Sequence, residues 1–95
     1  MEEYKLSKPI EFDGKKIEKL SLNLEGLTGQ DIMICEQEFR DRCRPGEIVE
    51  LIEVNKLFLA ILAARAAKAP YDLFAELSAK DFCRITVEVQ AFLAP

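Results

Sequence analysis

The sequence contains no histidine and no tryptophan, and it has only three cysteines and four glycines in 95 residues. Without histidine there is no Ser-His or Cys-His pair to activate a nucleophile, and no side chain that ordinarily titrates near neutral pH. Gly14, Gly26, Gly29 and Gly46 are too scattered to form a glycine-rich phosphate loop. The composition therefore indicates a protein that is not an enzyme and that needs no cofactor.

The few cysteines do not suggest a metal site. Cys35, Cys43 and Cys83 form no C-x-x-C pair. On one helix, the first two would lie about 12 Å apart at about 1.5 Å per residue, which is too far for a disulfide. Zinc would need all three thiolates and a carboxylate at unrelated spacings. We therefore expect reduced, inert thiols and no bound metal.

Long hydrophobic runs are also missing. The stretch LFLAILAARAA, residues 57–67, has eleven positions and includes Arg65, whereas a membrane-spanning helix needs about 20 apolar residues. The opening MEEYKLSK has no apolar run behind its charges, so no signal peptide is expected. The net charge of −4 argues against general nucleic-acid binding. We expect a cytoplasmic protein that binds neither membranes nor nucleic acid.

What is present is typical of a folded domain. The chain is 49% hydrophobic and 32% charged, and its length predicts a single domain spanning residues 1–95. Residues 1–25 predict a β-hairpin, because Asp13-Gly14 is a strong type I′ turn signal. The regular register pairs Ile10 with Ile17. One extra residue near Glu18 or Lys19 is then needed, and residues 20–24 direct three leucines towards one apolar layer: Leu20, Leu22 and Leu24.

Residues 28–94 predict the helical part of an α+β fold that is mostly α. Thr28 and Ser78 are N-cap signals, each followed three residues later by an aspartate. The apolar spacing predicts three main helices: one after Thr28, one from about residue 47 to 68 that includes Asn55, and one after Ser78. A short helical turn is expected at residues 71–77.

The stretch LFLAILAARAA has two apolar stripes when it is drawn as a helix. Phe58, Leu59 and Leu62 lie on the face that predicts a core. The opposite stripe has two interpretations: the domain covers it, or another chain does. We hypothesise that another chain covers this stripe, and that homo-oligomers hide it when no other partner is bound. The opposite stripe consists of Leu57, Ala60, Ile61 and Ala64. Together with Met33 and Ile34 of the first helix, these are the expected partner-binding residues.

A series of segments resembles one protein family. KLSKPIEFDGKKIEKLSLN, LTGQDI, LAARAAKAP and LSAKDFCRITVEVQAFL occur in the order seen in the tail assembly chaperones of P2-like and Mu-like contractile-tailed phages and prophages. The resemblance implies a non-catalytic protein that keeps the tape-measure protein soluble, assists assembly of the tail-tube protein, and is absent from the mature virion. The family often also has a longer form made by ribosomal frameshifting, and a chain ending FLAP would correspond to the short form.

The alternative is a helical interaction or regulatory module of prophage or bacterial origin, including an antitoxin-like protein. A DNA-binding version should have a helix dense in arginine and lysine. Only Arg40, Arg42 and Arg44 approach that pattern, and Asp41 interrupts them.

Overall fold

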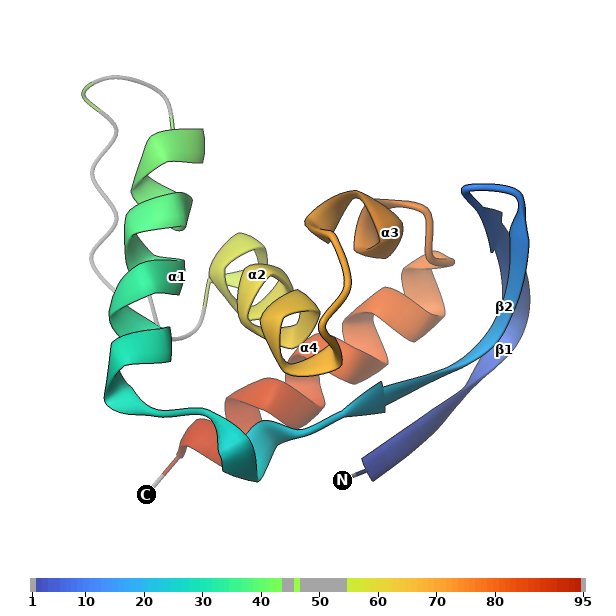
Figure 1. Cartoon of the computed structure of the whole chain (residues 1–95), viewed down its shortest axis with the longest axis horizontal. Helices are drawn as coiled ribbons and strands as arrows, with labels where there is room; N and C mark the ends of the chain where they lie inside the picture. Colours follow the sequence, from blue (N-terminus) through green and yellow to red (C-terminus); the bar gives the residue numbers. More distant parts are fainter. Residues whose placement is uncertain (1, 44–45, 47–54, 95) are drawn as a thin grey trace.

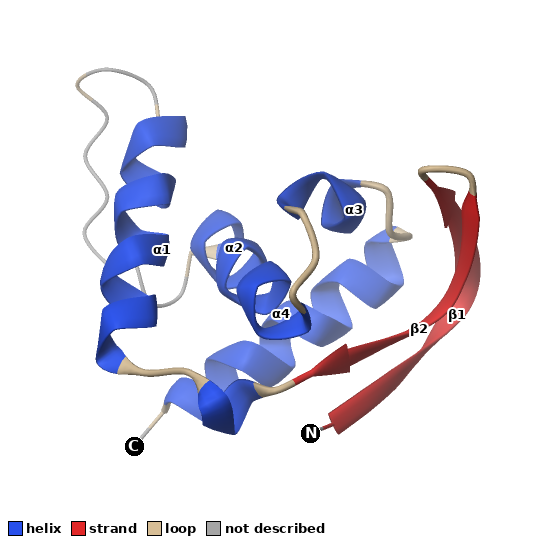
Figure 2. Cartoon of the chain, viewed as in Figure 1, coloured by secondary structure: helices blue, strands red, loops and turns tan. Residues whose placement is uncertain are grey.

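The computed structural model describes residues 2–43, 46 and 55–94. The elements in chain order are β1 (Glu2–Phe12), β2 (Lys15–Leu22), a 3-10 turn η1 (Leu24–Gly26), α1 (Gly29–Arg42), α2 (Lys56–Ala67), α3 (Tyr71–Ala75) and α4 (Ala79–Leu93). The hairpin lies at one edge of the molecule and the helices make up the rest (Figure 2). The predicted α+β class, with a hairpin followed by helices, is confirmed.

The hairpin turns where the sequence predicts. Asp13 and Gly14 have φ values of 54° and 78°, as a type I′ turn requires at both central positions. Ile10 pairs with Ile17 and Glu11 with Lys16. The leucines of the predicted apolar layer are buried, although the last of them belongs to η1 and not to the strand: Leu20, Leu22 and Leu24.

The extra residues that shift the hairpin register are in β1, and not in β2 as predicted. The register shifts between Lys5 and Ile10 of β1, where four residues of β1 lie opposite the single Glu18 of β2. The reason is that β1 bends towards α4 at this point. Ser7 and Lys8 donate their backbone N–H groups to Asp81 of α4, and Pro9 has no N–H to donate.

Both predicted N-caps are present. The Thr28 hydroxyl accepts from the Asp31 N–H, and the Asp31 carboxylate accepts from the Thr28 N–H, which completes a capping box. Ser78 caps α4 by accepting from the Asp81 N–H. On the core side of α4, the Thr86 hydroxyl donates to the Phe82 carbonyl one turn earlier.

The helix predicted from residue 47 to 68 is wrong at Asn55. This residue is extended, with ψ of 125°, and its side chain accepts from the Leu57 N–H as the N-cap of α2. An asparagine that satisfies a free N–H at a helix start is favoured over one inside an apolar helix face. Residues 47–54 of the predicted helix lie outside the described part of the chain.

The core is built around α2. This helix contacts α1, α3, α4 and β2, and Figure 1 shows it between α1 and α3 with α4 behind it. Phe58 of α2 meets Phe39 of α1 edge to face, with ring centroids 6.3 Å apart. The surrounding elements therefore cover α2 on most of its circumference.

Candidate partner-binding surface

Most of the predicted second stripe of α2 is core. Ala60, Ile61 and Ala64 are only 0%, 3% and 4% exposed, and Leu57 is half-buried. The expectation that the domain leaves this stripe uncovered is therefore wrong, because α1 and α3 also pack on α2. A small domain covers both sides of α2 since the helix is short and rich in alanine, which lets neighbouring helices approach closely.

Met33 and Ile34 are on the surface as expected. Their side chains are 65% and 42% exposed on α1. Gln30 and Gln37 lie one turn before and after this pair. Three carboxylates lie at the same spacing, each paired with an arginine: Asp31 with Arg65, Glu36 with Arg40, and Glu38 with Arg42. The structure therefore separates the predicted set: an exposed pair on α1, and a mainly buried group on α2.

The charges of α1 are paired along the helix. Arg40 binds Glu36 at 2.9 Å, and Arg42 binds Glu38 at 3.2 Å, each at the i,i+4 spacing. Gln37 also donates to Asp41. These arginines are engaged with carboxylates on their own helix, and Arg44 lies outside the described residues. The described part of α1 is thus not the cationic helix that DNA binding would need.

Arg65, the one charge in LFLAILAARAA, bridges α2 to the start of α1. Its Nε lies 2.6 Å from Oδ1 of Asp31. The Thr28 N–H bond, and after it the contact with Arg65, lower the pKa of Asp31 below its usual range. Open hollows of about 430 Å³ and 210 Å³ lie beside this bridge, and Ala64 lines both of them. The arginine therefore holds two helices together at the rim of these hollows.

A hollow that the sequence did not indicate lies between α3 and the start of α4. It measures about 380 Å³, and its lining includes Tyr71, Phe74, Phe82 and Cys83. The guanidinium of Arg42 stacks on the Tyr71 ring, 4.4 Å from its centroid. The signal available in the sequence was a row of apolar residues four apart on the outer face of α4: Ala79, Cys83, Val87 and Ala91.

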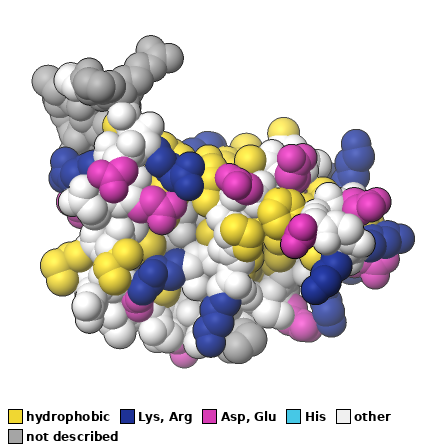
Figure 3. Space-filling view, turned by 45° about the horizontal axis from the view of Figure 1, so that its top comes forward, with side chains coloured by type: hydrophobic (Ala, Val, Ile, Leu, Met, Phe, Trp, Pro, Cys, Tyr) yellow, Lys and Arg dark blue, Asp and Glu magenta, His cyan; other side chains and the backbone are white. Residues whose placement is uncertain are grey.

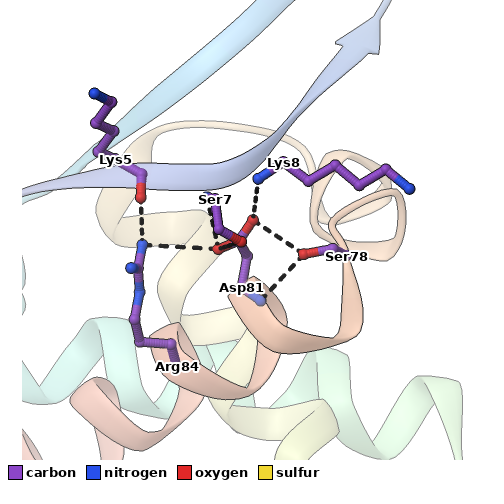
Figure 4. A network of polar contacts seen from close by, with 6 residues as sticks. All are labelled: Lys5, Ser7, Lys8, Ser78, Asp81 and Arg84. Carbon is purple, nitrogen blue, oxygen red and sulfur yellow. Dashed lines mark hydrogen bonds and ion pairs between the residues drawn. The ribbon is translucent and has the colours of Figure 1, made fainter.

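A buried carboxylate joins the hairpin to α4 (Figure 4). Asp81 is 1% exposed and accepts from the Ser7 N–H and hydroxyl, the Lys8 N–H and the Ser78 hydroxyl, at 3.0 to 3.2 Å. Burial alone would raise the pKa of Asp81, but these hydrogen bonds outweigh it and lower the pKa to about 2. Arg84 adds a contact to Asp81 at 3.8 Å and donates to the Lys5 carbonyl. The sequence showed this aspartate only as part of a helix cap.

The described side chains are engaged in core packing, helix capping and ion pairs, and a few apolar ones are exposed on the helices. The sequence model of a family described as phage tail assembly chaperone proteins, E, or 41 or 14, matches residues 3–94. The chain belongs to this family. The resemblance found in the sequence is confirmed over nearly the whole length of the tail assembly chaperone. No curated protein and no solved structure matches it.

All three cysteines of the chaperone lie in the part of the chain that the structure describes. No group of three or more Cys, Asp and Glu side chains in residues 2–43 and 55–94 is arranged to hold a metal ion. Burial raises the pKa of the Cys35 thiol to about 11, whereas Cys83 is exposed. None of the helices described is long and apolar enough to cross a membrane.

Proposed function

We propose that this tail assembly chaperone binds the tape-measure protein of its phage and keeps it soluble while tail-tube subunits assemble around it. It does so in the host cytoplasm without catalysis, and it leaves before the virion is complete. The observation that supports the proposal, beside the family, is the exposed apolar pair on α1, Met33 and Ile34. An amphipathic client helix buries its apolar residues against such a surface.

The chemistry of the pair suits a long and repetitive client. Methionine is unbranched and polarizable, so one Met33 side chain adapts to different apolar partners along a helix. Gln30 and Gln37 lie on both sides of the pair. They offer hydrogen bonds, and the carboxylates one turn further along, Glu36 and Glu38, are each paired with an arginine of the same helix. Two exposed residues give weak binding, so several chaperones would hold one client by multivalency.

The test is co-expression of the chaperone with the tape-measure protein of the same phage. Wild-type chaperone should keep the client in the soluble fraction and co-purify with it. The double variant Met33→Glu/Ile34→Glu should lose most of this effect while its far-ultraviolet circular dichroism stays unchanged, because both side chains lie at the surface.

The matched control is Gln30→Glu/Gln37→Glu, which adds the same charge to the same helix but keeps the apolar pair. This control should retain most of the solubilisation. Equal losses in the two double variants would show that charge, and not the apolar pair, is responsible. If wild-type chaperone has no effect on client solubility, the proposed function is wrong.

A further inference from the structure

The two outer edges of the hairpin differ in their hydrogen bonding. On β1, Arg84 of α4 donates to the Lys5 carbonyl. The N–H groups of Ser7 and Lys8, further along β1, donate to Asp81 of α4 (Figure 4). The proline that follows them has no N–H to donate. The middle of the β1 edge is therefore occupied by α4 and has no free backbone groups for another strand.

The outer edge of β2 is open. In an antiparallel pair, opposite residues that are not hydrogen-bonded to each other direct their backbone groups away from the partner strand. The Lys5 carbonyl binds α4 and not β2, so Lys5 and its pair Lys19 are such residues. Ser21, two residues after Lys19, has the same orientation. Within the described residues, the backbone of β2 makes no hydrogen bond to any segment other than β1. Lys19 and Ser21 thus offer N–H and C=O groups to an added strand.

The open part of this edge ends at a hollow. Asn23, which follows β2, donates its N–H to the Ala66 carbonyl of α2 at 3.1 Å. Asn23 and Lys68 both line the open hollow of about 430 Å³ beside Arg65. A strand that pairs with β2 therefore has the Lys68 side chain close to one of its ends.

Lysine is the main charged residue along the edge. Figure 3 shows Lys and Arg side chains among Asp and Glu side chains at the hairpin end of the molecule, on the right. The two ion pairs of β2, Lys16–Glu18 and Lys19–Glu3, join side chains that are all at least 60% exposed, and such pairs contribute little energy. Within the described residues, Lys15 and Lys68 are in no ion pair. The strand thus has three lysines and one glutamate to present to a partner: Lys15, Lys16, Lys19 and Glu18.

We propose that the outer edge of β2 binds an extended, acidic segment of another protein by β-strand addition. The backbone groups of Lys19 and Ser21 supply hydrogen bonds that an extended chain satisfies, and the lysines select a segment that has carboxylates. A second copy of this chain is disfavoured as the occupant, because its own β2 carries the same lysines. This site goes beyond the binding of an apolar client helix at α1 and does not depend on it.

The test is nuclear magnetic resonance of the whole chain, labelled with nitrogen-15, in the presence of two eight-residue peptides. The first peptide alternates glutamate with valine, because β-branched residues favour strands. The second has lysine in place of glutamate. The glutamate peptide should shift the amide signals of Lys19 and Ser21 and slow their exchange with solvent, and added salt should weaken this binding. The lysine peptide should bind at least about 10-fold more weakly.

Charge-reversed variants locate the peptide on β2. Lys16→Glu/Lys19→Glu should weaken binding of the glutamate peptide by about 10-fold and strengthen binding of the lysine peptide. The matched control is Lys5→Glu/Lys8→Glu, which makes the same charge change on exposed side chains of β1 and should alter the affinity by less than about 3-fold. Ser21→Pro removes one N–H from the open edge and should abolish the protection of Lys19.

Three results would overturn the proposal: no signal shift along β2, equal binding of the two peptides, or equal losses in the two double variants. Protection of Lys19 and Ser21 that rises with chaperone concentration, without any peptide, would instead assign the edge to a second copy. Met33→Glu/Ile34→Glu should leave peptide binding unchanged, so a failure here is distinguishable from a failure of client binding.

Discussion

Replacing Asp81 by alanine should remove the hydrogen bonds that hold the hairpin to α4 and so lower the stability of the domain. The carboxylate receives hydrogen bonds from two side-chain hydroxyls and from the N–H groups of Ser7 and Lys8. Hydrogen bonds to a charged acceptor contribute about 1.5–3 kcal/mol, and unsatisfied buried donors cost about 1–3 kcal/mol. Ser7 and Lys8 are exposed, so water will satisfy part of the loss. We expect Asp81→Ala to lower the free energy of unfolding by about 3 kcal/mol.

A loss of that size is easy to measure in a chain of this length. Three kcal/mol corresponds to a fall in Tm of about 12–24 °C for a domain near 100 residues, from a total stability of about 5–15 kcal/mol. The matched control is Asp72→Ala, an exposed aspartate near the start of α3, which should change stability by less than about 0.5 kcal/mol. Amide exchange should also accelerate at Ser7 and Lys8.

The pH dependence gives an independent check. The pKa of Asp81 is about 2 in the folded protein, below the usual value of about 3.9. A lowered pKa means that the stabilisation is fully present above about pH 4 and is lost as the pH falls towards about 2. The difference in unfolding free energy between wild type and Asp81→Ala, measured with urea, should therefore be constant above about pH 5 and narrow as the pH falls from about 4 to about 2. A constant difference, or a loss no larger than that of Asp72→Ala, would refute this account.

Ile61→Glu should destabilise the domain as strongly as Phe58→Glu, by about 3–5 kcal/mol, because both side chains are at most 3% exposed and an unpaired buried charge costs about that much. An Ile61→Glu protein that keeps the wild-type Tm in circular dichroism melting would contradict the burial. Thr28→Ala should cost about 1 kcal/mol through the lost cap of α1, and an unchanged Tm would count against the capping box. In native protein a thiol reagent should modify Cys83 quickly and Cys35 only after unfolding, because Cys35 is buried with a raised pKa. Equal rates for the two cysteines in mass spectrometry would disagree with the structure.

The sequence alone was sufficient to predict local structure wherever the interaction partners of a residue lie close to it along the chain. The turn at Asp13-Gly14 requires only the backbone freedom of two neighbouring residues. The caps at Thr28 and Ser78 are completed three residues later by Asp31 and Asp81. The family resemblance belongs to this group too, because it follows the order of such local segments, and the family match over residues 3–94 confirms it.

Asn55 shows where local reasoning stops being sufficient. Apolar periodicity continued across it and predicted one helix from about residue 47. An asparagine is compatible with a helix interior on grounds of spacing, but its side chain strongly favours the N-cap position. The structure places it at the start of α2, so a preference of the side chain outweighed the periodicity.

The tertiary structure alone decided which apolar residues are covered. A helical projection places Phe58 and Ile61 on different stripes of α2, but it does not show how many neighbours the helix has. Helices α1, α3 and α4, strand β2 and the turn η1 all contact α2, so both stripes are mainly buried. Among the described residues, the large exposed apolar side chains are on α1 and α4 instead: Met33, Ile34, Val87 and Phe92. The bend of β1 depends in the same way on Asp81, which is 74 residues from Ser7 along the chain. Burial and long-range hydrogen bonds are properties of segments brought together by folding, and no local pattern in the sequence encodes them.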